Sequence, residues 1–318
     1  MGKSRNLSKS YTDSEIDSDV IDAKAGRKNL IINGGFDVWQ RGTSFSSNGY
    51  TADRWAVTGS GTFSFAKHGE PNKVLVSMVS EGSFCNLLQA IETSDVVKLR
   101  GKQVTLSAYM TTNSIHSGQF SIGARYSNTT DTLTLQSTSV ISEAKTVGTD
   151  TTRVSVTFTV PVDAVGLLLF IDNAVVQAAG SLYDVSEVQL ELGSQATDFE
   201  YRSYGEELAL CQRYYCEFSA GGLIGTAASS YYVHYYYPYP VEMRATPTFL
   251  KGGGGYRVGD MVSTGFTSSS STSSVGGYHN KKVAHIRLDG FSGLTPYRSY
   301  AYEPDNTYTG YLKFDAEL

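Results

Sequence analysis

Apolar and polar residues alternate along much of residues 29–200, and this alternation predicts β-strands. In residues 103–111 every second side chain is apolar, so one face of the segment suits a core and the other suits solvent. Residues 165–172 are almost all apolar, which predicts a strand that is buried on both faces. The remaining predicted strands of this region are residues 30–32, 54–57, 62–66, 73–79, 120–126, 153–160 and 182–192.

About eight strands without a convincing helix between them indicate an antiparallel sandwich of the jelly-roll type. The pattern changes at residues 204–216, where two glutamates precede an apolar stripe formed by Leu208, Cys211 and Tyr215. Acidic residues favour the first turn of a helix, and the stripe has helical spacing. The segment is therefore predicted to be a helix that connects two domains.

Residues 217–318 contain a second series of short strands, which predicts a smaller β-sandwich. The glycine run at 252–255 and the Ser/Thr-rich residues 267–274 predict loops. The strands are expected at residues 230–239, 246–250, 282–288, 299–302 and 308–316. The chain is thus expected to be all-β, with an arm at 1–28, a jelly roll at 29–203, a connector helix at 204–216 and a Tyr-rich β domain at 217–318.

Residues 1–28 are predicted to be an arm that docks onto another protein. The segment runs from basic to acidic and back to basic, and it has too few apolar residues to form a core of its own. Ile16, Val20 and Ile21 have the spacing of a short helix, so we take them as the candidate docking residues.

Tyrosine is unevenly distributed, since 17 of the 22 tyrosines follow residue 200. One face of the predicted strand at 230–239 carries Tyr231, Val233, Tyr235 and Tyr237, and the other carries Tyr232, His234, Tyr236 and Pro238. Two interpretations are open: a core face with an ordinary outer surface, or a subunit interface or receptor surface.

Two tryptophans add to this picture. Trp55 lies in a predicted strand and is expected in the core, whereas Trp39 lies in a predicted loop where its ring could stack on a sugar. The candidate glycan or receptor contacts are Trp39, Tyr231, Tyr235, Tyr237, Tyr256 and Tyr278.

Composition narrows the classes of partner. The net charge is −5, from 26 basic and 31 acidic residues, and no cluster of Lys and Arg forms a basic stripe, so nucleic-acid binding is not expected. Apolar runs are far shorter than the ~20 residues that a membrane helix needs. The polar N-terminus has no apolar segment of a secretory signal, and we expect assembly in a cytoplasm.

The sequence lacks the usual motifs of catalysis. It has no GxSxG, HExxH or GxGxxG pattern and no phosphate-binding loop, which favours a protein without enzymatic activity. Cys85, Cys211 and Cys216 do not form a disulfide framework and are expected to be small buried apolar residues. The five histidines are scattered, so no metal site is predicted.

Several segments, taken in the order of the chain, resemble phage tail-fibre and other virion proteins. The first two resemble the opening of a jelly-roll module, the third its closing strand, and the fourth the connector that follows. The segments are residues 29–42 (NLIINGGFDVWQRG), 50–55 (YTADRW), 189–200 (QLELGSQATDFE), 205–215 (GEELALCQRYY), 240–248 (PVEMRATPT) and 315–318 (DAEL). The resemblance covers most of residues 29–318 and leaves out the arm.

The resemblance implies a homo-oligomer, with a trimer favoured, that contacts other virion proteins through the arm and a host-surface glycan or receptor elsewhere. The jelly roll also resembles carbohydrate-binding modules, which often hold a structural calcium ion. Asp37 and Asp184 fall at comparable places in this sequence. Calcium takes six to eight oxygen ligands, and two carboxylates do not establish a site, so no cofactor is assigned.

Three functions follow from these observations. The first is a non-enzymatic tail fibre of a virion, assembled in the host cytoplasm, that recognises the host surface. The second is a capsid decoration or head-fibre protein anchored by residues 1–28. The third and weaker one is a glycan depolymerase, because a sandwich fold can bring together carboxylates that are distant in sequence.

Overall fold

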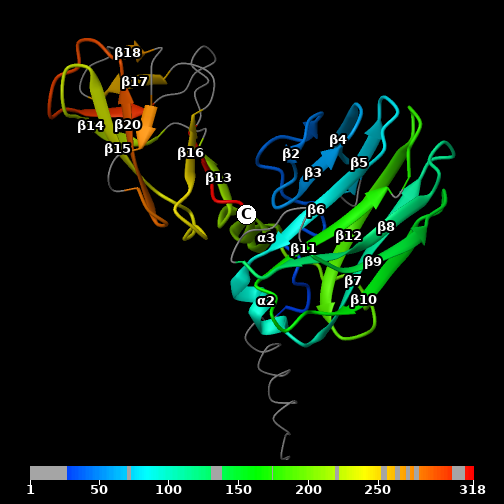
Figure 1. The fold of residues 1–318 in the computed structure, drawn as a ribbon. Coiled ribbons are helices and arrows are strands. Elements are labelled where there is room, and N and C mark those ends of the chain that lie inside the picture. Colours follow the sequence, from blue (N-terminus) through cyan, green and yellow to red (C-terminus); the bar gives the residue numbers. More distant parts are fainter. Residues whose placement is uncertain are drawn as a thin grey trace, which may run out of the picture.

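The computed structural model of the chain describes residues 27–69, 73–129, 138–173, 175–218, 222–251, 256–261, 266–269, 273–275, 279–302 and 312–318. Its strands form two sandwiches that are connected through a short helix (Figure 1). The predicted docking residues Ile16, Val20 and Ile21 lie outside the described residues. Within the described ranges, no helix is long and apolar enough to cross a membrane.

The N-terminal sandwich consists of two six-stranded antiparallel sheets. The first sheet has the order β1 (Ser44–Phe45), β4 (Phe63–His68), β5 (Lys73–Met78), β12 (Leu182–Leu192), β7 (Gln103–Thr112) and β10 (Thr152–Thr159). The second has the order β2 (Gly49–Tyr50), β3 (Ala56–Gly59), β6 (Cys85–Ile91), β11 (Gly166–Asn173), β8 (Gln119–Ser127) and β9 (Thr138–Thr146). The prediction of an antiparallel jelly-roll sandwich is confirmed.

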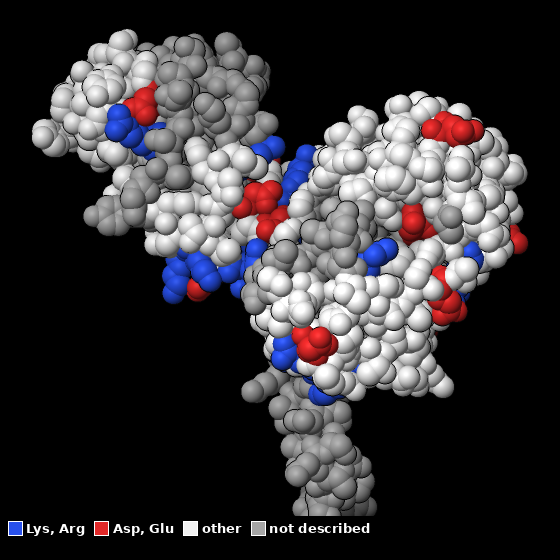
Figure 2. All heavy atoms as spheres, in the orientation of Figure 1, with Lys and Arg blue, Asp and Glu red and all other residues white. Residues whose placement is uncertain are grey.

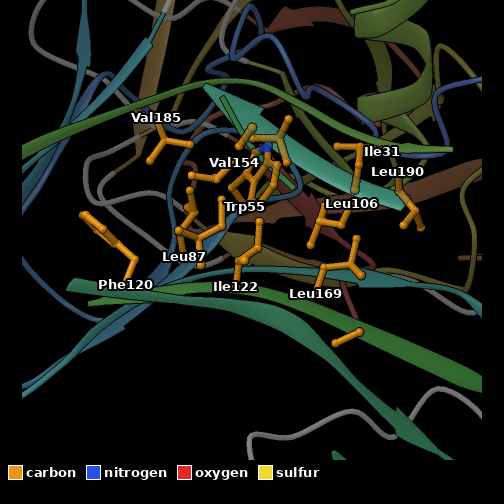
Figure 3. Packing of buried hydrophobic residues seen from close by; sticks show 14 of the residues in the cluster. Ile31, Trp55, Leu87, Leu106, Phe120, Ile122, Val154, Leu169, Val185 and Leu190 are labelled. Atoms are coloured by element: carbon orange, nitrogen blue, oxygen red, sulfur yellow. The ribbon is translucent and has the colours of Figure 1, made fainter. Parts of the chain in front are cut away.

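The alternating side chains of these strands build the core between the two sheets (Figure 3). The apolar face predicted for residues 103–111 is buried, and Leu106 packs with Leu169 and Ile122 of the opposite sheet in the same cluster. Trp55 is 1% exposed and donates its indole Nε1–H to the carbonyl of Asn33 at 2.8 Å. The prediction of Trp55 as a core residue is confirmed.

Several elements of this sandwich escaped the sequence pattern, among them β6, a short helix and β9. All residues of β6 are buried, so this strand shows no alternation. The short helix α2 (Thr93–Leu99) lies where no helix was predicted, and β9 has no buried residue and is exposed along most of its length. Residues 30–32 were predicted as a strand but are not one, although the Leu30 amide donates to the Leu190 carbonyl at 2.8 Å.

The C-terminal sandwich has a seven-stranded sheet and a three-stranded sheet, both antiparallel. The larger sheet has the order β18 (Phe266–Ser269), β17 (Tyr256–Asp260), β21 (Ser299–Tyr302), β14 (Ile224–Ala227), β15 (Tyr232–Pro238), β20 (Val283–Asp289) and β19 (Ser273–Val275). The smaller has the order β13 (Tyr215–Phe218), β22 (Leu312–Asp315) and β16 (Thr248–Lys251). Within the segment 267–274 that was predicted as a loop, residues 267–269 lie in β18 and residues 273–274 lie in β19, where backbone pairing tolerates their serine and threonine side chains.

The connector helix is α3 (Tyr204–Gln212), which begins with a capping box formed by Ser203 and Glu206. The side chain of Glu207, 5% exposed, accepts the Asn33 amide proton at 2.6 Å and pairs with Arg202 at 3.2 Å. The helix is shorter than the predicted 204–216, because Tyr215 already enters β13. A buried carboxylate thus ties the helix to the first residues of the N-terminal sandwich.

Charged side chains join the two sandwiches (Figure 2). Arg54 of the N-terminal sandwich is 1% exposed, pairs with Glu317, and lies over the ring of Tyr214 at 3.5 Å from its centroid. Burial works to lower the pKa of Arg54, but the charge and hydrogen bond of Glu317 together with the phenols of Tyr214 and Tyr50 outweigh it, so this pKa is raised above its usual range. Arg41 pairs with the same carboxylate at 3.2 Å. We call Arg41, Arg54, Tyr214 and Glu317 the junction.

The last residues of the chain cover an apolar part of the N-terminal sandwich. Leu318 packs against a small cluster formed by Leu88, Ala90, Leu168 and Phe170 on the outer face of the second sheet. The hydroxyl of Tyr50 donates to the Leu318 carbonyl at 2.9 Å. The C-terminal segment therefore contributes to both sandwiches, and Figure 1 shows it between them.

All three cysteines are buried and free, which confirms their interpretation as small apolar residues. Burial raises the pKa values of the Cys85 and Cys216 thiols to about 12. A thiol rather than a thiolate is present at neutral pH, so neither sulfur is a good nucleophile.

We expect Glu317→Ala to lower the free energy of unfolding by about 3–5 kcal/mol, because it leaves the buried Arg54 cation unpaired. Replacing both partners, as Arg54→Leu with Glu317→Leu, removes the unpaired charge and should recover part of that loss. The free energy of unfolding of both variants is measured by unfolding in urea.

The control for this experiment is Glu242→Ala. Glu242 pairs with Lys282 at 3.5 Å, but the two side chains are 56% and 75% exposed, so the loss should stay below about 1 kcal/mol. Equal losses for Glu317→Ala and Glu242→Ala would contradict a structural role for the junction.

The protonation of His116 should make the stability of the fold depend on pH. It is 7% exposed, stacks on Phe120 at 4.8 Å between ring centroids, and accepts the Gly118 amide proton on Nδ1 at 2.9 Å. Burial lowers its pKa to about 4. The unfolded chain takes up this proton near pH 6.5 and the folded chain only near pH 4, so stability should fall between these values by at most about 3 kcal/mol.

The urea concentration at the midpoint of unfolding is measured at a series of pH values between pH 7 and pH 4. His116→Phe keeps a stacked ring but cannot take a proton, so its baseline stability differs while the His116 part of the pH slope disappears. An unchanged slope in this variant would exclude His116 as its source.

Candidate functional site

Two of the predicted contact residues belong to the core of the C-terminal sandwich. Tyr235 is 1% exposed and meets the ring of Tyr302 edge to face at 6.4 Å. Tyr237 is half-buried and stacks on Phe314 at 5.7 Å. Their face of β15 also carries Val233, and it packs against the smaller sheet. The prediction that Tyr235 and Tyr237 face a partner is therefore corrected.

Trp39 completes the edge of the N-terminal core. It is half-buried, its ring lies 6.0 Å from that of Phe65 and 6.4 Å from that of Phe45, and its Nε1–H donates to the Phe36 carbonyl at 2.6 Å. One edge of the indole is thus used for packing and its polar atom for a backbone contact. This arrangement favours a structural role over sugar stacking.

Of the three remaining candidate contacts, one side chain lies at the surface and two lie outside the described part of the structure. Tyr231 is 50% exposed and meets Tyr232 edge to face at 5.1 Å, so it lies at the surface as predicted. Tyr256 lies in β17, but its side chain is outside the described part of the structure. Tyr278 is outside the described residues altogether.

The outward face of β15 is the one opposite to the predicted contacts. It carries Tyr232, His234 and Tyr236, with Tyr236 53% exposed. The antiparallel register with β20 pairs Tyr236 with His285 and His234 with Arg287. Because side chains alternate along both strands, two histidines on neighbouring strands become diagonal neighbours on the same face.

A pocket of about 290 Å³ opens on this face. It is lined by Thr226, Ala227, Ala228, His234, Tyr236, His285 and Tyr297. The small side chains of β14 form one wall, and the aromatic and imidazole rings of β15, β20 and the loop before β21 form the rest. We call these seven residues the aromatic pocket.

Three rings of the aromatic pocket are stacked. The rings of Tyr236 and His285 lie 4.7 Å apart at an angle of 8°, and those of His285 and His234 lie 4.7 Å apart at 27°. His285 Nε2 and His234 Nδ1 are 2.7 Å apart and share a hydrogen bond. Burial lowers the pKa values of both imidazoles, so the pair is neutral at pH 7.

A compensated charge flanks the pocket. The Arg287 guanidinium lies 4.1 Å from the centroid of the Tyr232 ring and donates to Asp289 at 2.7 Å. Because the cation is paired, this side of the pocket contributes little net charge. The pocket therefore combines aromatic faces with neutral hydrogen-bonding groups.

The backbone at Tyr297 is strained. This residue has φ of 65° and its side chain is 88% exposed. A bulky side chain in the left-handed region is uncommon, and such strain clusters at ligand-binding sites. The neighbouring backbone holds the conformation, since the Tyr297 amide donates to the Ala227 carbonyl at 2.7 Å and the Thr295 amide donates to the Tyr300 hydroxyl at 2.9 Å.

The geometry suits binding better than catalysis. Aromatic faces contact the C–H surfaces of a ligand, and imidazoles with tyrosine and threonine hydroxyls exchange hydrogen bonds with its polar groups. Carboxylates are not among the residues that line the aromatic pocket. Hydrolysis of a glycosidic bond needs a pair of carboxyl groups, and this pocket does not supply one.

The carboxylates named for calcium, Asp37 and Asp184, both lie among the described residues. Asp184 is engaged by His68, whose Nδ1 lies 3.0 Å from Oδ1 of the carboxylate. Among the residues that the structure describes, no group of three or more His, Cys, Asp or Glu side chains is placed to hold a metal ion.

The sequence prediction named the face of β15 that is buried rather than the face that is exposed. The period of two separates the faces of β15, but both are aromatic, so the period alone does not identify the core face. Two signals were present: Val233 is the one aliphatic residue of the strand, and in β20 Ala284, Ile286 and Leu288 alternate with His285 and Arg287. The strained loop of Tyr297 had no such signal.

No known protein family and no curated protein matches the sequence. Similar solved structures include a CBM4 module, with 13% identity over 51% of this chain and 98% of that chain and a TM-score of 0.38. The enzymatically active domain of tailspike protein 4 of bacteriophage CBA120 has 15% identity over 52% of this chain and 21% of that chain, with a TM-score of 0.36. The CBM22-1 xylan-binding domain of Xyn10C from Paenibacillus barcinonensis has 19% identity over 48% of this chain and 94% of that chain, with a TM-score of 0.32.

The strain at Tyr297 can be measured by comparing two variants. Tyr297→Gly should be more stable than Tyr297→Ala by about 1 kcal/mol, because glycine adopts a positive φ without the steric penalty that a Cβ brings. Urea unfolding of both variants tests this expectation. Equal stability, or a more stable alanine variant, would show that the backbone at this position is unstrained.

Proposed function

We propose that the chain is a non-enzymatic glycan-binding protein of a phage virion, of the tail-fibre type, and that its aromatic pocket contacts the saccharide. The observation that carries the proposal is the aromatic pocket itself, in which Tyr236 and Tyr297 are exposed beside a neutral histidine pair. Exposed aromatic side chains that lie together in a concave patch mark sites of contact with a ligand or partner.

The chemistry of the pocket fits an uncharged polyol. A pyranose ring presents axial C–H groups to an aromatic face and hydroxyls around its rim. Tyrosine offers a large contact area at low conformational-entropy cost, with a polar tip for hydrogen bonding. The paired state of Arg287 and the neutrality of His234 and His285 leave no strong field to select a charged ligand.

The virion assignment rests on the sequence rather than on the pocket. The segments that resemble tail-fibre proteins occur in order along both sandwiches and the connector. The arm at residues 1–28 would dock onto the particle, and the two sandwiches would extend away from it. A trimer is favoured for the assembled protein.

We expect Tyr236→Ala to weaken glycan binding by about tenfold or more, which corresponds to ~1.4 kcal/mol. Tyr297→Gly should weaken it similarly while preserving stability, because it removes the exposed ring and relieves the backbone. Binding is measured on an array of neutral hexose oligosaccharides and bacterial O-chains, followed by calorimetry with the strongest binder.

The matched control is Tyr204→Ala, since Tyr204 is 60% exposed but lies at the start of α3, away from the pocket residues in sequence and sheet. This variant should bind as the unaltered protein does. Equal losses for Tyr204→Ala and Tyr236→Ala would argue against the pocket as the contact. The absence of binding at micromolar protein to every glycan would argue against glycan recognition.

Three further measurements separate the proposal from its alternatives. A cryo-electron microscopy map of intact particles locates the protein, and density only at capsid lattice points would favour a decoration or head-fibre protein. Light scattering should give three times the chain mass of 34.5 kDa if the protein is a trimer. New reducing ends after incubation with the bound polysaccharide would indicate a depolymerase.

A further inference from the structure

The aromatic pocket lies over β14, with a tyrosine on either side of it. In the larger sheet, β14 is flanked by β15, which carries Tyr236, and by β21, which begins two residues after Tyr297. The pocket residues on and directly after β14 have small side chains, and two of them, Thr226 and Ala228, are exposed. The pocket therefore has a floor of small side chains and an aromatic ring on each side.

One face of the Tyr236 ring is turned towards this floor. The other face is covered by His285, whose ring lies 4.7 Å away at an angle of 8°. His285 belongs to β20, which lies on the opposite side of β15 from β14, so the face turned towards β14 is the one left for a ligand. The side chain of Tyr236 as a whole is 53% exposed. His285 and His234, which share a hydrogen bond at 2.7 Å, thus position the ring from behind.

The two tyrosines are offset along the strands as well as across them. Thr226 pairs with His234, and Tyr236 lies two residues further along β15. Tyr297 lies in the opposite direction, where its amide donates to the Ala227 carbonyl at 2.7 Å. The offset is three residues along the strands and two strand spacings across them, which at ~3.3 Å per residue and ~4.8 Å per spacing puts the two backbones about 14 Å apart.

One sugar ring does not span this distance. Carbon atoms in van der Waals contact are ~3.5–4 Å apart, so a ring stacked between two tyrosines needs them only about 8 Å apart. Side chains of a strand stand roughly perpendicular to the sheet, so the ring of Tyr236 stays over its own place on β15. Two linked sugar rings bridge the gap, and each of them then meets one tyrosine.

The pocket suits a short segment of an uncharged chain. Its volume of about 290 Å³ is at the lower end of the range for ligand pockets. None of its seven lining residues is Asp, Glu, Lys or Arg, and the nearby Arg287 is paired with Asp289 at 2.7 Å. Tyr297 is 88% exposed and Tyr236 53%, so a chain can continue past either ring. These features favour an internal segment of a neutral polysaccharide.

We propose that the aromatic pocket binds two consecutive residues of a neutral polysaccharide, one stacked on Tyr236 and the next stacked on Tyr297 from the other side of the chain. The exposed hydroxyl of Thr226 lies on the floor between them and exchanges a hydrogen bond with a hydroxyl of the saccharide. This inference rests on the proposed function, and it adds the length of the bound segment and the place of each sugar residue.

Two stacking contacts joined by one ligand make affinity depend on chain length. A monosaccharide occupies one tyrosine at a time, whereas a disaccharide occupies both without a second loss of translational freedom. Affinity should therefore rise by about tenfold or more from the monosaccharide to the disaccharide. It should rise by less than about threefold from the disaccharide to the tetrasaccharide, because further residues extend past the two rings.

The first experiment measures this series by calorimetry, with mono- to tetrasaccharides of the strongest neutral binder of the array. Tyr297→Gly and Tyr236→Ala should each bind the monosaccharide and the disaccharide with affinities within about twofold of each other, because one stacking contact remains. Equal affinity of the unaltered protein for both ligands would overturn the inference. Retention of the full gain with length in Tyr297→Gly would overturn it as well.

The second experiment fills the floor between the two rings. Ala228→Leu adds an exposed side chain there and should weaken disaccharide binding by about tenfold or more, since the bridging segment loses its place. Ala144→Leu is the matched control, because Ala144 is also exposed but lies in β9 of the N-terminal sandwich. This variant should bind as the unaltered protein does. Full disaccharide binding by Ala228→Leu would show that the segment does not lie over β14.

The third experiment locates the sugar residues by saturation-transfer NMR with the disaccharide. In the unaltered protein, saturation should reach the C–H protons of both residues, and in Tyr297→Gly it should fall by about half or more on one of them. Transfer to a single residue in the unaltered protein would overturn the two-residue assignment.

The outcomes separate this inference from the proposed function. Saccharide binding that does not depend on chain length, or that is unaffected by Ala228→Leu, would overturn the two-residue assignment and leave glycan binding in place. The absence of binding for every member of the series would overturn both. A gain with length that disappears in each tyrosine variant would support both.

Discussion

A buried guanidinium holds the two sandwiches together. Arg54 lies where it cannot be hydrated, so its charge must be balanced by protein groups, and these come from distant parts of the chain. Tyr214 follows the connector helix and provides a ring face, and Glu317 provides a carboxylate. The cation is thus compensated only when the N-terminal sandwich, the connector and the chain end are all in place. Folding of the last strand and docking of the two sandwiches become coupled through one charge.

This use of charge bears on the character of the outer face of β15. Only 18% of the residues are charged, and several of them, including Arg41 and Glu207, are engaged at or near the junction. The aromatic pocket, in contrast, is lined by uncharged residues at neutral pH. Charged pairs therefore act where the parts of the chain meet, whereas the pocket offers aromatic faces and neutral hydrogen-bonding groups.

The sequence predicted what depends on local periodicity and missed what depends on neighbours. Alternation identified β7, β10 and β12 because one face of each meets the core and the other does not. It failed for β6, where Leu318 helps to cover the outer face, since a strand buried on both sides has no period. The junction could not be predicted either, because Arg54 and Glu317 are 263 residues apart and no local pattern links them.

The aromatic pocket shows the same limit in a form that matters for function. Alternation along β15 puts His234 and Tyr236 on one face, but only the register with β20 brings His285 beside them. The strained φ of Tyr297 depends on a third element, because backbone and hydroxyl contacts from β14 and β21 hold that loop on both sides of the residue. Such strain persists only where the surrounding structure over-determines it. The pocket thus depends on the register of neighbouring strands and on one strained loop, and no local pattern of the sequence contains either of them.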